Sequence, residues 1–160
     1  MRSSINKINC FMILSLLFIL PGISVAGSHA TISIDDAYVR VVPPGQKNTG
    51  VFMTLHNPSD TVRSIISAES NSAEIVELHT HINEGGMMKM RRIDKIEIPA
   101  KGMTMLKPGG LHVMLIGLTE EIVEGKPVEI TLVFANGERA SFNAVGRKLK
   151  MKMDHSGMKH

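Results

Sequence analysis

The stretch Val128–Ala144, VEITLVFANGERASFNA, decides the fold class. Apolar and polar side chains alternate on both sides of Asn136-Gly137. Alternation with a period of two is typical of a strand that buries one face. Asn-Gly is a strong signal for a two-residue hairpin turn, because both residues tolerate positive φ. The stretch therefore predicts two antiparallel strands, Val128–Phe134 and Ala140–Ala144, joined by a two-residue turn.

The preceding hundred or so residues show the same pattern. Further strand-like runs are Thr31–Ile34, Ala37–Val42, Gly50–His56, Val62–Ala68, Glu74–His81, Met87–Ile93, Ile96–Ile98, Met103–Leu106 and His112–Leu118. Turn-forming clusters such as Pro43-Pro44-Gly45 separate them. Short strands at this spacing, without a long helical period, predict an all-β single domain, an antiparallel sandwich or barrel. Leu118–Glu124 is compatible with either a helical turn or a loop.

The N-terminus has the order of charge, apolar run and small residues that is typical of a secretory signal peptide. Arg2 and Lys7 precede Phe11–Leu20, which is too short to span a bilayer comfortably. Cleavage fits after Ala26 or after Ala30. We therefore expect an exported protein of the periplasm without stable membrane insertion.

The exported chain has a restricted chemistry. The one cysteine, Cys10, lies inside the signal, which excludes disulfides and thiolate metal sites from the mature protein. Loss of Arg2 and Lys7 leaves 16 of the 18 basic residues against 15 acidic ones, and no basic stripe carries interleaved aromatic residues. A nucleic-acid partner is therefore not expected. We also expect no enzyme, because the sequence has no nucleophile elbow, paired catalytic carboxylates or phosphate-binding glycine loop.

The end of the chain differs in composition from the rest. Residues 147–160, RKLKMKMDHSGMKH, alternate Lys, Met and His. Their potential metal ligands are Met151, Met153, His155, Met158 and His160. Short His-rich tracts are typical of metal-binding arms, and the alternative is a solvated, frayed chain end. The chain thus divides into a signal over residues 1–26 (ending as late as 30), a β-sandwich domain over 31–146 and a flexible tail over 147–160.

Histidine and methionine are predicted to meet on one hairpin. If Asn83–Gly86 forms the loop, residues whose numbers sum to 169 lie opposite each other. His79 then faces Met90, and His81 faces Met88. Opposed side chains have Cβ atoms about 4.5–5.5 Å apart, close enough to share one ion. We expect His79 and Met90 to be ligands, and His81 to lie at the surface or behind the ligands.

A second strand supplies two more donors. His112 and Met114 stand two residues apart, so both point to one face, and the four donors converge if that strand lies beside the hairpin. Thioethers are soft ligands that favour Cu(I), whereas zinc prefers thiolate, imidazole or carboxylate. A blue-copper electron-transfer centre needs a cysteine thiolate, which the mature chain lacks. The donor set therefore predicts a Cu(I) carrier rather than an electron carrier.

Other histidines and methionines have structural explanations. Met53 and His56 stand three residues apart on one strand, so they face opposite sides, and we interpret both as structural. Met103 and Met105 share a face and are interpreted as packing or rim residues near the site.

The spacing His79-x10-Met90-x21-His112-x-Met114 resembles the metal motif of the periplasmic copper chaperone family PCuAC, also called the DUF461 domain. The resemblance covers about Ile32–Val145, and its supporting segments are Ala37–Arg40 with Pro43–Gly45, Gly85–Arg91 and Leu106–Leu115. It implies a cupredoxin-like Greek-key β-sandwich that holds Cu(I) through the four motif residues. It also implies a Met/His-rich tail that adds Cu(II) capacity. Thr80 departs from the pattern, since many members have methionine there.

The resemblance further implies delivery of copper for assembly of the cytochrome c oxidase copper centre. The receiving protein is then an oxidase subunit or a Sco-type assembly protein, and we expect the carrier to be a monomer. A second hypothesis is sequestration of copper for tolerance, with the same ligands. A third is a β-sandwich interaction module whose histidines and methionines are incidental.

Overall fold

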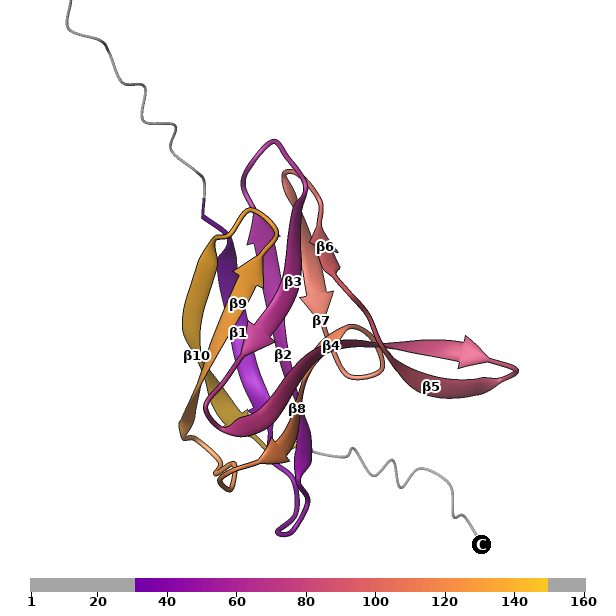
Figure 1. Ribbon diagram of the computed structural model, residues 1–160, viewed down its shortest axis with the longest axis vertical. Helices are drawn as coiled ribbons and strands as arrows, with labels where there is room; N and C mark the ends of the chain where they lie inside the picture. Colours follow the sequence, from indigo (N-terminus) through magenta and orange to yellow (C-terminus); the bar gives the residue numbers. More distant parts are fainter. Residues whose placement is uncertain (1–30, 150–160) are drawn as a thin grey trace, which may run out of the picture.

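Ten strands form the part of the chain that the computed structural model describes, residues 31–149 (Figure 1). They are β1 (Ser33–Arg40), β2 (Asn48–Asn57), β3 (Arg63–Glu69), β4 (Ala73–Glu84), β5 (Met87–Arg92), β6 (Ile96–Ile98), β7 (Gly102–Leu106), β8 (His112–Leu118), β9 (Pro127–Phe134) and β10 (Arg139–Arg147). The all-β prediction is confirmed, and residues 119–124 form a loop after β8, which ends at Leu118. Over these residues the structure has no helix long and apolar enough to cross a membrane.

The strands follow the order β5-β4-β8-β2-β1-β10-β9-β3-β6, and β7 pairs with the part of β2 that β8 leaves free. The sheet folds over on itself, so that β3 contacts β4 and β6 contacts β7. One pair, β1 with β10, is parallel, which departs from the purely antiparallel prediction. Parallel neighbours need a long connection, and here the rest of the domain supplies it.

The core lies between the facing layers of this folded sheet and follows the period of two. In β9, Val128, Ile130, Leu132 and Phe134 are buried and the residues between them face outward. Each fully buried side chain of this size stabilises the fold by about 1.5–3 kcal/mol relative to an exposed one. This packing fixes which face each strand presents to solvent.

The hairpin between β9 and β10 is confirmed, but its two-residue turn is wrong. Phe134 donates its N–H to Glu138 at 2.8 Å and accepts from the N–H of Gly137 at 2.9 Å, so the loop holds the three residues 135–137. Gly137 has φ +83, as expected for the last residue of a three-residue hairpin loop.

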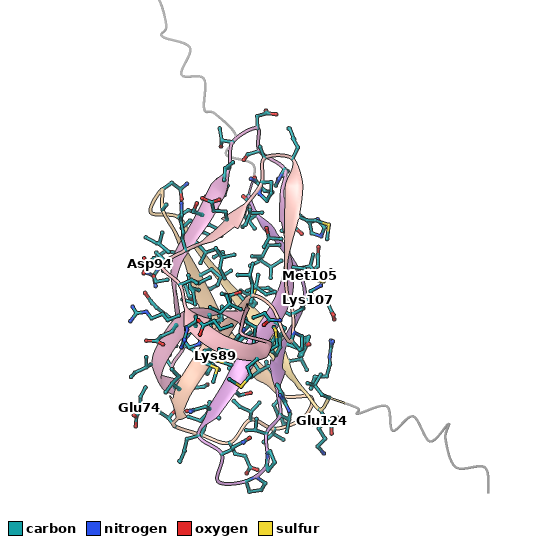
Figure 2. The ribbon with its side chains drawn as sticks, turned by 90° about the vertical axis from the view of Figure 1, so that its right-hand side faces the viewer. Glu74, Lys89, Asp94, Met105, Lys107 and Glu124 are labelled. Atoms are coloured by element: carbon teal, nitrogen blue, oxygen red, sulfur yellow. The ribbon has the colours of Figure 1, made fainter. Side chains whose placement is uncertain are left out.

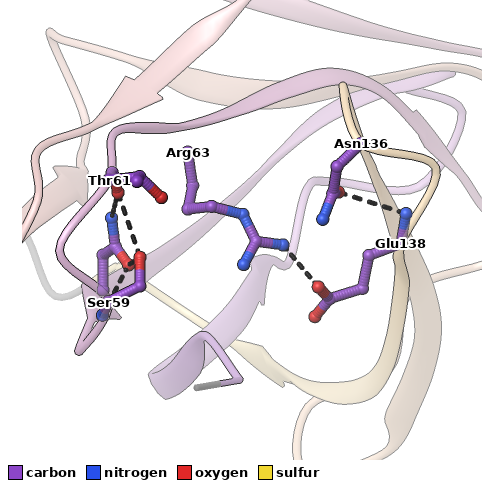
Figure 3. Close-up of polar contacts among 6 residues, drawn as sticks. Ser59, Thr61, Arg63, Asn136 and Glu138 are labelled. Atoms are coloured by element: carbon purple, nitrogen blue, oxygen red, sulfur yellow. Dashed lines mark hydrogen bonds and ion pairs between the residues drawn. The ribbon is translucent and has the colours of Figure 1, made fainter. Parts of the chain in front are cut away.

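The same hairpin contacts the first residue of β3 (Figure 3). Arg63 forms an ion pair with Glu138, and its guanidinium lies 5.4 Å above the centre of the Phe134 ring. Asn57, which is buried, donates to the carbonyl oxygens of Thr61 at 2.8 Å and Ile98 at 3.1 Å. These contacts join β2, β3 and β6 to the hairpin of β9 and β10 at this end of the domain.

The two runs predicted near the start of the described chain form one strand, β1. Its pairing with β2 shifts register between Asp35 and Tyr38, and Asp36 has φ +49 there. A bulge of this kind adds a residue without ending the strand. In β2, Met53 faces the core, and His56 is half-buried and lies 3.3 Å from a carboxylate oxygen of Asp35. Both residues thus have structural contacts, as the sequence predicts.

Candidate metal site

The hairpin of β4 and β5 extends away from the rest of the sheet (Figure 1) and carries Lys89 toward the viewer in Figure 2. The predicted four-residue loop is wrong, because Glu84 pairs with Met87 and only Gly85-Gly86 turn the chain. Their φ values of +60 and +85 are those of a two-residue type I′ turn, which glycine adopts without steric cost. Asn83 accepts from the N–H of Gly86 at 2.9 Å.

The shorter loop moves the pairing by two residues. His81, not His79, lies opposite Met90, and His79 lies opposite Arg92. Met88 no longer faces a histidine and is 58% exposed, so the predicted His81–Met88 pair is wrong. Because the shift is even, no side chain changes face, and His79 and Met90 stay on one face as diagonal neighbours.

β8 lies on the other side of β4 and brings the second pair of predicted donors. His112 is opposite His79, and Met114 is opposite Glu77. Opposed residues share a face, so β5, β4 and β8 present imidazoles and thioethers on one surface. The rings of His79 and His112 have centroids 5.7 Å apart.

A cavity of about 300 Å³ opens on this surface. Four of its lining residues are His81, Met90, His112 and Met114. Phe52 of β2 also lines it, and the Phe52 ring lies 6.0 Å from that of His112, centroid to centroid. His79 is not among the lining residues. Three of the four predicted ligands therefore line the cavity, and so does His81, which the sequence predicts to lie at the surface or behind the ligands.

One ring nitrogen of His112 is free to bind a metal ion. It is 2% exposed, and its Nδ1 lies 3.0 Å from the carbonyl oxygen of Gly110. A carbonyl only accepts, so Nδ1 carries the proton and Nε2 the lone pair. That Nε2 is buried and has no hydrogen-bond partner. Burial, together with the nearby His81 and His79, holds the pKa of His112 below its usual range against the opposing Gly110 bond, so the ring is neutral at pH 7.

His79 has the complementary arrangement. Its Nε2 lies 2.8 Å from a carboxylate oxygen of Glu77, which fixes the proton on Nε2 and leaves the lone pair on Nδ1. Nδ1 is buried and unpartnered. Arg92 forms an ion pair with the other oxygen of Glu77 at 3.3 Å. A histidine held by a carboxylate in this way is typical of metal ligands.

Two methionines interpreted as packing or rim residues do not line the cavity, and the predicted tail donors lie outside the described residues. Met103 and Met105 are about half exposed on β7, pair with His56 and Thr54 of β2, and do not line the cavity. The predicted tail ligands Met151, Met153, His155, Met158 and His160, and the predicted signal over residues 1–26, lie outside the described part of the chain. Within residues 31–149, no three His, Cys, Asp or Glu side chains are grouped to hold a metal by themselves.

Comparisons with known proteins agree with this architecture. The family described as "Putative lipoprotein LpqE-like" matches residues 32–145. A "Putative lipoprotein Lxx21020" of Leifsonia xyli subsp. xyli is 28% identical over 107 residues, which are 66% of this chain and 63% of that protein. The chain thus spans less than two thirds of this relative.

Two solved structures share the fold. The solution structure of CuI-DR1885 from Deinococcus radiodurans is 33% identical, with a TM-score of 0.61, and the match covers 79% of this chain and 86% of that one. The copper-bound PCuAC domain from PmoF2 is 24% identical, with a TM-score of 0.63, over 74% and 93% of the two chains. The fold is therefore the cupredoxin-like β-sandwich of PCuAC domains, and the chain belongs to the LpqE-like family, the PCuAC (DUF461) family that the histidine and methionine spacing predicts.

Proposed function

We propose that this protein is an exported copper carrier that holds Cu(I) through His79, Met90, His112 and Met114. The observation that carries the proposal is the pair of unpartnered nitrogens, His79 Nδ1 and His112 Nε2. Among the described residues they are the buried side-chain N or O atoms without a hydrogen-bond partner. Leaving a buried polar atom unpaired costs about 1–3 kcal/mol, and a bound metal ion removes that cost.

The donor chemistry favours copper in its reduced state. Met90 and Met114 line the cavity beside His112, and thioethers are soft ligands that suit Cu(I). The similar proteins whose names state a metal are a Cu(I) form and a copper-bound form. We do not expect the site to catalyse a reaction, and a tail containing further His and Met would add Cu(II) capacity.

The exposure of Met90 favours transfer of copper to another protein over storage. Met90 is 40% exposed on a hairpin that extends from the domain, so a second protein can reach the ion there. We propose that the carrier works in the periplasm as a monomer after signal cleavage. The receiver would be an oxidase subunit or a Sco-type assembly protein that serves the copper centre of cytochrome c oxidase. The "lipoprotein" description of the family is in keeping with export.

An anaerobic Cu(I) titration against a competing chelator tests the binding. The double variant Met90→Leu, Met114→Leu should bind Cu(I) at least tenfold more weakly, because leucine keeps the apolar volume and removes both thioethers. Met103→Leu, Met105→Leu is the matched control, since it removes two exposed thioethers on β7 that do not line the cavity. Equal affinities for the wild type and the cavity variant would refute the ligand assignment.

Sequestration is the alternative function for the same site. Cells that lack the protein and are starved of copper should lose oxidase activity if the protein delivers copper. Normal oxidase activity, combined with sensitivity to excess copper alone, would instead favour sequestration. The Met90→Leu, Met114→Leu variant should fail to restore whichever phenotype is seen.

A further inference from the structure

His81 has the position of a ligand, although the family spacing does not include it. It lies directly opposite Met90 on β4 and lines the same cavity as Met90, His112 and Met114. His79, the histidine that the spacing selects, lies beside the cavity lining and is bound to Glu77. The cavity surface thus contains an imidazole that the four-residue motif leaves unexplained.

The distances between the rings fit shared coordination. A metal–nitrogen bond of about 2.0 Å and a ring radius of about 1.1 Å place each ring centre about 3.1 Å from the ion. Two imidazoles on one tetrahedral ion then have centres about 5.1 Å apart, and wider angles increase that separation. The centroids of His81 and His112 are 5.3 Å apart, and those of His79 and His112 are 5.7 Å apart. Both pairs fall in this range.

One backbone carbonyl orients two of the rings. The oxygen of Gly110 lies 3.0 Å from Nδ1 of His112 and 3.5 Å from Nδ1 of His81. The second contact is long and weak, but a carbonyl favours a protonated Nδ1 in both rings. Each ring then has its lone pair on Nε2. Gly110 thereby prepares His81 and His112 in the same tautomer.

We propose that His81 is a direct ligand of the copper ion, a further imidazole beside those of His79 and His112. Because no three histidine or carboxylate side chains among the described residues are grouped to hold a metal by themselves, the thioethers of Met90 and Met114 complete the site. This inference rests on the proposed function. Together with Met90 and Met114 the site then has five donors. Cu(I) is a d10 ion like zinc and takes about four ligands. One donor is therefore always free, and a free donor beside the ion lets copper exchange ligands without leaving the protein.

The test is nitrogen NMR of the full-length, 15N-labelled protein during an anaerobic Cu(I) titration. Cu(I) is diamagnetic, so two-bond 1H–15N correlations of the histidine rings report which nitrogen binds. With one equivalent of Cu(I), we expect the Nε2 signal of His81 to shift together with those of His79 Nδ1 and His112 Nε2. His56 is the internal control, because it lies on β2 outside the cavity lining.

A variant series accompanies the spectra. His81→Gln should weaken Cu(I) binding about three- to tenfold and slow transfer to a chelator, whereas His56→Gln should do neither. Amide spectra of the metal-free variants establish that each is folded. Shifts at His79 and His112 with none at His81 would overturn this proposal and leave the copper site intact. Failure of the wild type to bind Cu(I) in chelator competition would overturn both.

Discussion

Replacing Glu77 with glutamine keeps the shape of the side chain but removes the charge that fixes the tautomer of His79. The carboxylate only accepts, so it holds a proton on Nε2 of His79, 2.8 Å away, and leaves the lone pair on Nδ1. A glutamine amide can also turn and donate to Nε2. The proton then moves to Nδ1 and blocks the nitrogen that we propose as the ligand.

The expected loss of Cu(I) affinity follows from the exposure of His79 and Glu77 to solvent. Partners of metal-binding histidines typically contribute 10–100-fold to affinity, about 1.4–2.7 kcal/mol. The side chains of His79 and Glu77 are 13% and 22% exposed, so water screens the contact only in part. Because glutamine can still accept in one of its two orientations, Glu77→Gln should weaken Cu(I) binding about tenfold, at the lower end of that range. The ion pair with Arg92 adds little, since its guanidinium is largely exposed.

The assay is Cu(I) competition with a chelator at neutral pH, with urea denaturation of the metal-free protein alongside. Stability should change by no more than about 1 kcal/mol, because only one hydrogen bond is altered. Glu74→Gln is the matched control, since Glu74 is an exposed residue of β4 on the opposite face. An affinity of Glu77→Gln within twofold of the wild type would refute the reasoning. Equal losses in both variants would indicate a general effect of charge instead.

Three further changes test the fold. Gly50→Ala places Cβ 2.8 Å from Cζ of Phe52, so the ring must shift, and urea denaturation should show a loss of about 1–3 kcal/mol; an unchanged midpoint would contradict this. Gly146→Ala places Cβ 2.2 Å from a backbone carbonyl oxygen, which cannot move aside like a side chain, and should cost about 3 kcal/mol or more; a folded variant of normal stability would show that the loop yields. The hydrogen bond from Arg147 holds the pKa of Asp36 below its usual range, so this carboxylate stabilises the fold above about pH 4 and the effect is lost as the pH falls through the lowered pKa. Asp36→Asn should therefore flatten the acid limb of stability against pH, and an equally steep limb would show that the ion pair contributes nothing measurable.

The sequence predicts the strands better than the loops between them. Periodicity and turn residues locate every strand to within a few residues, because burial of one face imposes a period of two. Both hairpin loops differ in length from the prediction. Asn136-Gly137 belongs to a three-residue loop, and Gly85-Gly86 alone form the loop predicted to hold four residues. Several loop lengths accept the same glycines, so composition alone does not select among them.

The wrong loop length matters for the site because it changes which residues of β4 and β5 lie opposite each other. It does not change the face of the sheet to which each side chain points. A shift of two residues keeps His79 and Met90 on one side of the sheet but puts His81 opposite Met90. The spacing motif therefore selects residues that share one surface of the sheet. It selects His79, whereas His81 is the histidine of β4 that lines the cavity. The pairing of β4 with β8, which brings His112 to His79, joins strands distant in the sequence, and no local pattern specifies it.

The predicted donors differ in how far their side chains are exposed to solvent. His112 is 2% exposed, the side chain of His79 is 13% exposed, and Met90 is 40% exposed on the edge strand β5. The buried imidazoles are held by Glu77 and by the carbonyl of Gly110, so in the proposed site they would set the position of the ion. The methionine is flexible and accessible, so an incoming ligand reaches the ion most easily from its side. With His81 directly across from Met90, the outer part of the proposed site has both a thioether and an imidazole that can exchange on the ion. A carrier needs a site that holds copper and also releases it, and in the site that we propose the buried and exposed ends of one donor set would divide those two tasks.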